Sequence, residues 1–133
     1  MALTQIVNDG LGASLTATSD GGAVTTSLQQ GLAKAWNCFD EGTSSTLRDS
    51  LNVASITDNG TSNFDTNFTN NMSNDDYVFT ASNANPNGAK CQIIAGTNVC
   101  SKTTGEYGIR SENSDGNFSD IDGVMTTVHG DLA

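Results

Sequence analysis

Apolar and polar residues alternate most regularly on either side of one turn in the middle of the chain. Residues 46–56 form the first predicted strand, and residues 58–61 (Asp-Asn-Gly-Thr) turn the chain. Phe64, Thr66 and Phe68 then alternate with polar residues along the return strand. Asn-Gly between two such runs favours a type I′ turn, because both central residues of that turn need a positive φ. The pattern therefore predicts a β-hairpin whose apolar face must be covered by further strands.

The first strand of this hairpin departs from strict alternation. Leu51 and Val53 share one face, whereas Ile56 would lie on the opposite face of a regular strand. One extra residue near Ala54 and Ser55 would return Ile56 to the face of the other two. We therefore predict a β-bulge at that point.

Shorter alternating runs predict strands elsewhere. They cover residues 14–19, 23–26, 77–82, 106–110 and 124–129, with a second hairpin over 90–100. The most helix-like stretch, residues 27–34, is interrupted by Gly31 and is limited to one or two turns. We therefore expect an all-β fold: a compact β-sandwich or barrel of about eight short antiparallel strands, with at most one short helix.

One apolar segment precedes the hairpin, over residues 34–40. It contains Trp36, the sole tryptophan of the chain. Large aromatic side chains dominate the energetics of small cores, so we expect Trp36 to pack there with Phe64, Phe68 and Tyr77. The alternative is an exposed Trp36 that stacks against a sugar.

The 133 residues have the length of one domain. Only 35% are apolar, which would also suit a disordered chain, but the alternation and the turn signals favour a folded one. Residues 1–33 are small and polar, so we expect a polar N-terminal arm with the first short strands, either docked on a neighbouring subunit or frayed. Residues 34–133 form the body of the β-sandwich.

The formal net charge of −10, with five basic residues spread thinly, argues against a nucleic-acid-binding surface. No apolar run is long enough to predict membrane insertion. The first residues, Met-Ala-Leu-Thr, carry no secretion signal, so we expect synthesis and assembly in a cytosol.

Three cysteines, Cys38, Cys91 and Cys100, leave one unpaired in any arrangement. Cys91 and Cys100 flank the predicted second hairpin, where a cross-strand disulfide is geometrically possible, although cytosolic thiols normally stay reduced. We expect Cys38 to be buried and inert. A zinc site is not indicated, because His129 is far from the cysteines in sequence and the spacing fits no known ligand pattern.

An acidic segment over residues 113–123 contains Asp115, Asn117, Asp120 and Asp122, which raises the question of calcium. If Gly123 takes the sixth position of a calcium-binding loop, the first position falls on a phenylalanine, which cannot ligate. We therefore interpret the Asp115 to Asp122 loop as solvated and predict no metal site.

Catalytic motifs are also not evident. His129 has no serine or cysteine nucleophile motif to pair with, so we expect a structural, partly buried histidine or one at an interface. A carboxylate pair for glycan cleavage would come together only in the fold, and this alternative stays open at the level of sequence. We predict no catalytic, cofactor-binding or metal-binding residues, and a protein that is not an enzyme.

A family resemblance is carried by one set of short motifs. They are Lys34-Ala35-Trp36, Phe39, residues 48–61 (Arg-Asp-Ser-Leu-Asn-Val-Ala-Ser-Ile-Thr-Asp-Asn-Gly-Thr), Phe64, Asn67-Phe68-Thr69 and Asp75-Asp76-Tyr77. In these residues the chain resembles a module of virion proteins of marine tailed bacteriophages. Residues 122–130 resemble its closing strand. Leu51 stands where that pattern has phenylalanine, and Asn37-Cys38 where it has valine-asparagine. The resemblance is specific over residues 34–79, looser over 90–130 and absent over 1–33.

The resemblance implies a structural protein on the exterior of a phage particle, often described as tail-fibre-like, and it implies no catalytic residues. A small acidic domain with a polar arm suits a capsid decoration, knob or cement protein, whose partners would be the major capsid protein and other virion proteins. We also expect self-association as a homotrimer. The alternative is a tail-fibre tip for host attachment, which would bind a host-surface glycan or protein through Trp36, Tyr77 or Tyr107 if these are exposed. A small glycan-cleaving virion enzyme is the third alternative.

Overall fold

A computed structural model of the chain describes residues 16–18, 25–27, 31–42, 45–84, 90–92 and 102–133. The chain divides into two compact units, Met1–Leu32 and Ala33–Ala133. In the first unit, β1 (Thr16–Thr18) and β2 (Thr25–Ser27) pair as a two-stranded antiparallel sheet.

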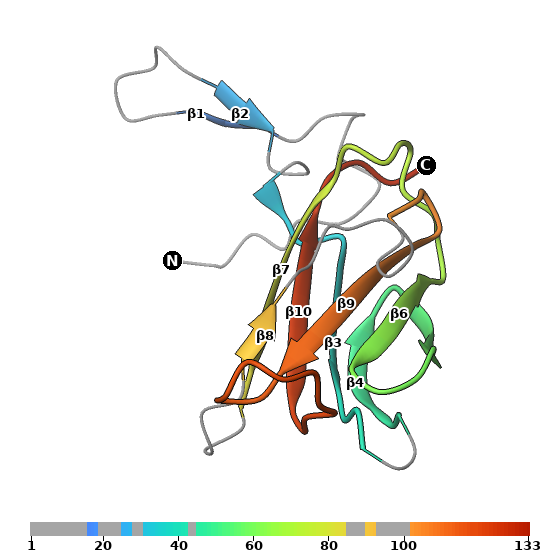
Figure 1. The fold of residues 1–133 in the computed structure, drawn as a ribbon. Coiled ribbons are helices and arrows are strands. Elements are labelled where there is room, and N and C mark those ends of the chain that lie inside the picture. The colour runs from blue at the N-terminus through green and yellow to red at the C-terminus, as the bar shows by residue number, and fades with distance from the viewer. Residues whose placement is uncertain (1–15, 19–24, 28–30, 43–44, 85–89, 93–101) are drawn as a thin grey trace, which may run out of the picture. The chain divides into compact units, whose positions relative to one another are not determined.

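The second unit contains two four-stranded antiparallel sheets (Figure 1). The β3–β10 sheet has the strand order β4 (Leu47–Leu51), β3 (Ala35–Phe39), β10 (Val124–His129) and β7 (Val78–Asn83). The β6–β9 sheet has the order β5 (Val53–Asp58), β6 (Asn63–Phe68), β9 (Glu106–Glu112) and β8 (Lys90–Gln92).

The two sheets enclose one hydrophobic core. Its buried members come from both sheets and from the loops between them: Ala35, Phe39, Val53, Phe64, Phe68, Met72, Tyr77, Tyr107, Ile109, Ile121, Val124 and Val128. Since neither β4 and β5 nor β7 and β8 are hydrogen-bonded as sheet neighbours, the sheets do not close into a barrel. The all-β prediction is confirmed, in the form of a sandwich.

Aromatic rings hold the middle of this core. The Phe68 ring lies 5.6 Å from that of Tyr77 and 5.5 Å from that of Tyr107, and Phe39 lies 5.9 Å from Phe64. Tilted and edge-on pairs at these separations contribute stability beyond the burial of their area. The predicted core positions of Phe64, Phe68 and Tyr77 are therefore confirmed.

Trp36 does not join them. Along β3 the buried residues are Ala35, Asn37 and Phe39, so Trp36 and Cys38 point to the outer side of the sheet and are only half-buried. The predictions of a core tryptophan and of a buried Cys38 are both wrong. Both errors have one physical cause. Because Asn37 points inward to make its hydrogen bonds, the alternation of the strand turns its two neighbours, Trp36 and Cys38, outward.

The predicted hairpin is present as β5 and β6, but its turn differs from the prediction. Of Asn59 and Gly60, only Gly60 has a positive φ, of 112°, and the second positive φ, of 67°, falls on Ser62. The Asn63 amide donates to the Gly60 carbonyl (2.9 Å), so the connection is longer than a two-residue type I′ turn. In this longer loop the Ser62 amide donates a hydrogen bond to the Asp120 carboxylate.

The single strand predicted over residues 46–56 is two strands in different sheets. The chain leaves β4 and enters β5 through Asn52, which has a φ of 57°. Leu51 therefore lies at the end of β4, where 48% of its surface is exposed, and it does not share a face with Val53. The predicted bulge is confirmed, because the β5–β6 register shifts between Val53 and Ser55 and Ile56 packs against the core.

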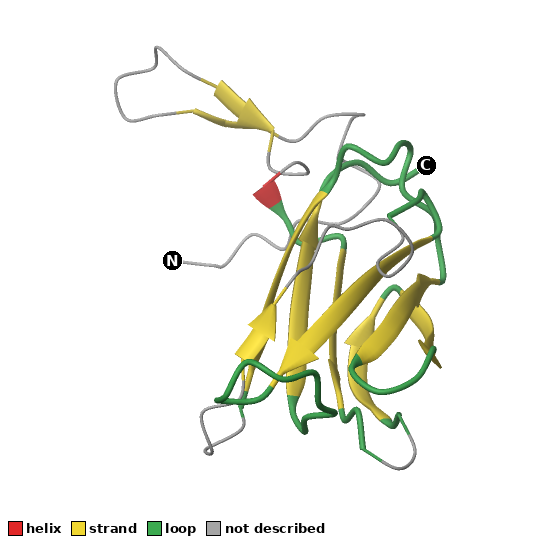
Figure 2. Ribbon diagram, in the orientation of Figure 1, coloured by secondary structure: helices red, strands yellow, loops and turns green. Residues whose placement is uncertain are grey.

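Strands and loops make up nearly all of the described residues (Figure 2). Of the helix-like stretch 27–34, Ser27 lies in β2, residues 28–30 are outside the described part, and Gly31 is helical. Most of the predicted hairpin over 90–100, including Cys100 and hence the possible Cys91–Cys100 disulfide, also lies outside the described residues.

Candidate functional site

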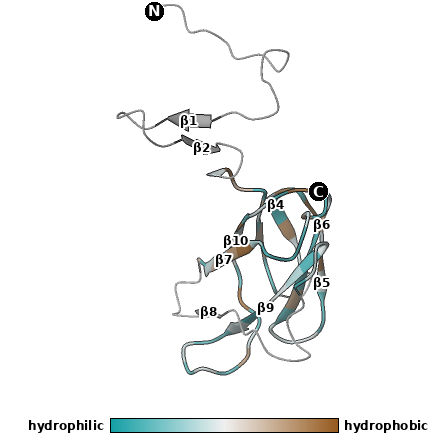
Figure 3. Cartoon of the chain, turned by 90° about the horizontal axis from the view of Figure 1, so that it is seen from above, coloured by the Kyte–Doolittle hydropathy of each residue, from teal (hydrophilic) through white to brown (hydrophobic). Residues whose placement is uncertain are grey.

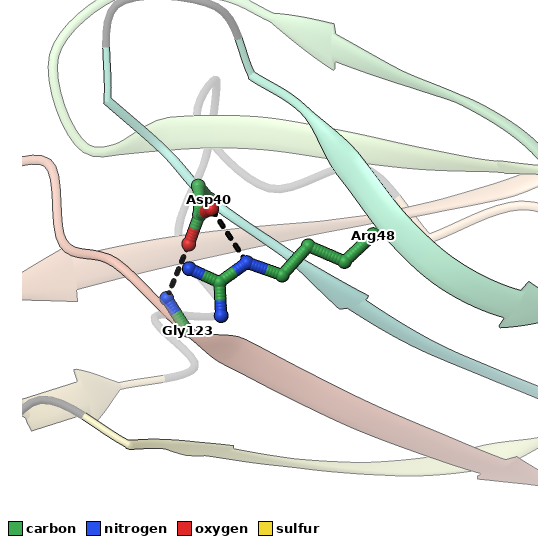
Figure 4. Close-up of polar contacts among 3 residues, drawn as sticks. All are labelled: Asp40, Arg48 and Gly123. Atoms are coloured by element: carbon green, nitrogen blue, oxygen red, sulfur yellow. Dashed lines mark hydrogen bonds and ion pairs between the residues drawn. The ribbon is translucent and has the colours of Figure 1, made fainter.

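Carboxylates at one end of the sandwich attach the β9–β10 loop to the β3–β4 connection. Asp40, directly after β3, accepts a hydrogen bond from the Gly123 amide (2.8 Å) and pairs with the Arg48 guanidinium (2.6 Å), as Figure 4 shows. Gly123 has a φ of 68°, and a Cβ there would lie 3.1 Å from that of Ala84. The close approach of the loop to the strand therefore requires glycine at this position.

Glu41, the next residue, is almost completely buried, with 1% of its surface exposed. One carboxylate oxygen accepts a short hydrogen bond from the Ser111 hydroxyl, and the other accepts the Ile121 amide at 2.8 Å. Both partners are themselves buried. Glu41 thereby connects the β3–β4 connection to β9 and to the end of the β9–β10 loop.

Burial raises the pKa of Glu41 to about 7 from its ordinary value of 4.5. The hydrogen bonds from Ser111 and Ile121 oppose this rise, while the negative charges of Asp120 and Asp122 add to it. Glu41 is therefore a carboxyl group that changes its protonation state near neutral pH.

Asp120 makes a third attachment of the same kind. Its carboxylate accepts the Ser62 amide at 2.6 Å, and the Ser62 carbonyl accepts the Ser111 amide at 3.1 Å. Three carboxylates, Asp40, Glu41 and Asp120, thus satisfy backbone amides of loops. The carboxylates therefore hold three connections together: β3–β4, β5–β6 and β9–β10.

The acidic loop does not collect its carboxylates around one point. The Asn113 side chain accepts the amides of Asp115 and Asn117, each at 3.0 Å, and Gly116 turns the chain with a φ of 81°. Asp120 is engaged with Ser62 instead. In the part of the chain that the structure describes, no group of three or more acidic, histidine or cysteine side chains is placed to hold a metal ion.

A buried polar network crosses the core between the sheets. The side-chain NH₂ group of Asn37 donates to the Thr66 hydroxyl (3.1 Å), and the Thr126 hydroxyl donates to the side-chain oxygen of Asn37 (2.7 Å). The Tyr107 hydroxyl and that of Thr126 share a further short hydrogen bond. Since buried polar groups are costly unless paired, this network favours one alignment of the two sheets over others.

The two outer faces of the sandwich differ in character, and Figure 3 shows that the strands carry both hydrophobic and hydrophilic residues. The β6–β9 sheet is polar outside: Asn67 donates to the Thr57 hydroxyl (2.9 Å), and Asn59 donates to Asp65 (2.6 Å). These bonds pair four of the polar side chains on this side of the sandwich with one another.

The β3–β10 sheet presents a more apolar surface, which we call the Trp36 face. Strand alternation and the register assign its outward positions to Trp36, Cys38, Asp49, Leu51, Val78, Thr80, Ser82, Met125, Thr127 and His129. Val78 is 64% exposed and Met125 36% exposed. An exposed apolar group of this kind is typical of an interaction surface.

The aromatic residues expected at a fibre tip lie in different places. Tyr77 and Tyr107 are buried, and the Tyr77 hydroxyl lies 2.7 Å from the Glu106 carbonyl and 2.9 Å from that of Thr103. Burial also raises the pKa of Tyr77. Of the three, only Trp36 is available at a surface.

His129 is exposed at the end of β10, opposite Val78, so the predicted partial burial is wrong, while the alternative position at an interface stays open. Cys38 is a free thiol. No described segment forms a helix with the length and apolar character needed to cross a bilayer.

The carboxylate attachments and the Trp36 face were both missed from the sequence. Asp40-Glu41 gave no signal beyond a weak acidic pair, because its partners lie far away along the chain. For the Trp36 face, the available signal was Asn37. This polar residue stands between Trp36 and Cys38, and in a regular strand it lies on the same face as Phe39 and on the opposite face from Trp36 and Cys38.

Comparisons of the chain with protein-family models, with curated proteins and with solved structures found no match.

Proposed function

We propose that the chain is a structural protein of a bacteriophage particle, a capsid decoration or cement protein bound to the outer shell. The observation that carries this proposal is the set of phage-like motifs over residues 34–79. The proposed partners are the major capsid protein and further copies of the chain, and the proposed location is the exterior of the virion.

The position of the motif residues in the fold supports treating them as one unit. Phe39, Phe64, Phe68 and Tyr77 all lie in the core, where they contact one another across the two sheets. Asn52, from the long motif, forms the connection between the sheets. The shared pattern therefore describes a sandwich core, which a family of structural modules would retain while its surfaces change.

The burial of Tyr77 and Tyr107 favours decoration over a fibre tip. A glycan-binding tip commonly presents aromatic rings on which sugars stack, and these two rings are inside the core. The acidic composition also suits an exterior protein, since a net charge of −10 keeps crowded copies soluble.

The test is the copy number of the chain in purified particles of the phage that encodes it, measured by quantitative mass spectrometry against the major capsid protein. Decoration of the capsid lattice predicts hundreds of copies in each particle. A few dozen copies or fewer would instead support the tail-fibre alternative. Particles without the chain would overturn the virion proposal as a whole.

A second measurement separates stabilisation from mere attachment. Particles with and without the chain are heated, and DNA release is followed with an intercalating dye. A cement protein predicts release at a lower temperature from particles that lack the chain. Equal release temperatures would contradict the cement role while leaving the location intact.

A further inference from the structure

The Trp36 face is nearly free of carboxylates in a strongly acidic chain. The sequence has 15 acidic residues against 5 basic ones, yet Asp49 is the single carboxylate at the outward positions of this sheet. Two copies of so acidic a protein repel each other over most of their surfaces. Of the two outer sheet faces that the structure describes, the Trp36 face is the one where two copies meet with less repulsion.

The polar ends of the face are arranged symmetrically about Trp36. In the β3–β4 ladder Asp49 lies opposite Cys38, and Cys38 lies two residues from Trp36 along β3. His129 lies two residues from Thr127, which pairs with Trp36 across the β3–β10 ladder. Trp36 is therefore one strand and two residues away from each of them, at the midpoint between Asp49 and His129.

We propose that two copies of the chain pair through the Trp36 face, about a two-fold axis that passes at Trp36. The axis lies in the plane of the face and is perpendicular to the line from Asp49 to His129. Because Trp36 is the midpoint of that line, this axis brings Asp49 of each copy to His129 of the other, and it brings the two Trp36 rings together. Aromatic anchors near the centre of an interface, surrounded by a polar rim, are typical of the residues that carry binding energy. This inference stands apart from the virion role, since it uses only the geometry and charge of the face.

The size of the face sets the expected strength. Four strands spaced by about 4.8 Å and six residues rising by about 3.3 Å each give a footprint of about 19 by 20 Å. This is smaller than the roughly 800 Å² that each partner buries in a standard interface. The pair is therefore weak, with dissociation in the micromolar range or above. A two-fold pair also differs from the homotrimer expected from the sequence.

Trp36 is the only tryptophan, so its fluorescence reports on the centre of this face alone. The full chain is studied from low micromolar to millimolar concentration by sedimentation equilibrium, in parallel with tryptophan emission and acrylamide quenching. The proposal predicts a monomer–dimer equilibrium, with emission moving to shorter wavelength and quenching decreasing over the same concentration range. A chain that stays monomeric, or an oligomer whose formation leaves Trp36 emission unchanged, would overturn it.

Substitutions test the axis itself. Leu51→Glu places a carboxylate on the exposed apolar part of the face and is expected to weaken pairing about tenfold. Ala54→Glu adds the same charge at an exposed position of β5, in the other sheet, and is expected to leave the dissociation constant unchanged. Equal effects of the two variants would show a general charge effect and contradict the proposed surface.

The reciprocal contact gives the sharpest test. His129→Asp would place a carboxylate opposite Asp49 in both halves of the pair, which should weaken association about fivefold. Adding Asp49→Lys to that variant replaces the two facing carboxylates by a pair of opposite charges and should return the dissociation constant at least to the wild-type value. If the double variant is no tighter than His129→Asp alone, the two residues do not meet across the axis. Circular dichroism of each variant checks that the fold is kept.

Discussion

Glu41 is the residue whose protonation couples directly to folding. Its pKa is about 7 in the folded chain, against an ordinary value of 4.5, so the folded state holds the proton more tightly than the unfolded state does. The stability that this provides is fully present below about pH 4.5 and is lost as pH rises through about 7. At alkaline pH the fold retains a buried negative charge near Asp120 and Asp122.

Glu41→Gln is expected to remove this pH dependence. The Gln oxygen can accept the Ile121 amide, and its NH₂ group can donate to the Ser111 hydroxyl, so both hydrogen-bonding sites stay occupied. Relative to the wild type, the variant should gain on the order of 3 kcal/mol of unfolding free energy between pH 4.5 and pH 8. Urea unfolding of both proteins across this range measures the difference. A difference that does not change with pH would show that Glu41 does not titrate as described.

Phe68→Ala tests the aromatic core. Phe68 contacts two tyrosine rings and is 6% exposed, so truncation leaves a cavity and should lower the unfolding free energy by about 3–5 kcal/mol. Phe118→Ala is the control, because Phe118 is 47% exposed and its ring lies 4.2 Å from the Arg110 guanidinium, a contact worth about 1 kcal/mol or less. Similar losses in the two variants would contradict the assignment of the core.

For single residues, the sequence correctly predicted those positions that depend only on the alternation of a strand. Phe64 and Phe68 were placed correctly because each lies on a strand with a regular period of two. Trp36 was misplaced because Asn37, a polar residue, takes the inward position for its bonds to Thr66 and Thr126. These partners are distant in the chain, so no local pattern predicts the phase of β3.

Among the described elements, β4 and β5 are joined by a single residue. The chain passes from one sheet to the other through Asn52, whose left-handed backbone is favoured mainly by glycine and asparagine. The Asn52 side chain also accepts the Asn70 amide (2.8 Å) and donates to its carbonyl (3.0 Å). A third bond runs from the Asn70 side-chain NH₂ group to the Asn52 side-chain oxygen (3.0 Å), so Asn52 combines a permitted backbone conformation with three side-chain bonds to the chain beyond β6.

Substitutions at Asn52 separate these two contributions. Asn52→Gly keeps the backbone conformation and loses the side-chain bonds, so it should lower the unfolding free energy by about 1–2 kcal/mol. Asn52→Ala should lose about 1 kcal/mol more, because a Cβ makes the left-handed conformation unfavourable. Chemical denaturation of the two variants gives the comparison. Alanine and glycine variants of equal stability would show that the backbone conformation has no energetic weight here.

The same junction explains why element boundaries were harder to predict than elements. The apolar pattern is continuous through Leu51 and Val53, so the sequence reads as one strand, and Asn52 alone signals the change of sheet. The bulge in β5 was predictable because it restores Ile56 to the core, which is a local requirement. The longer β5–β6 loop was not, because Ser62 is held by Asp120 from the β9–β10 loop.

For the whole molecule, the division after Leu32 leads to a prediction about truncation. All members of the core cluster belong to the second unit. A chain of residues 33–133 should therefore fold alone and keep a cooperative thermal transition with the near-ultraviolet circular dichroism of the full chain. Loss of cooperative unfolding in the truncated chain would show that residues 1–32 contribute to the core.

The fold class was predictable because strand number and spacing restrict the architecture of a chain of this size. The candidate surfaces were not, since they depend on which of two faces each strand turns outward. On the Trp36 face, residues from four strands adjoin only after the strands take their order in the sheet, and that order is not sequential.

That order also has a consequence in time. β3 is the first strand of the second unit and β10 is the last, yet they are direct neighbours in the sheet. During synthesis β3 is made before all the other strands of the sandwich, and β10 after them. The surface centred on Trp36 contains both strands, so it is complete only once β10 has emerged and joined the sheet. Pairing through this surface is thereby confined to chains in which the whole second unit has been made.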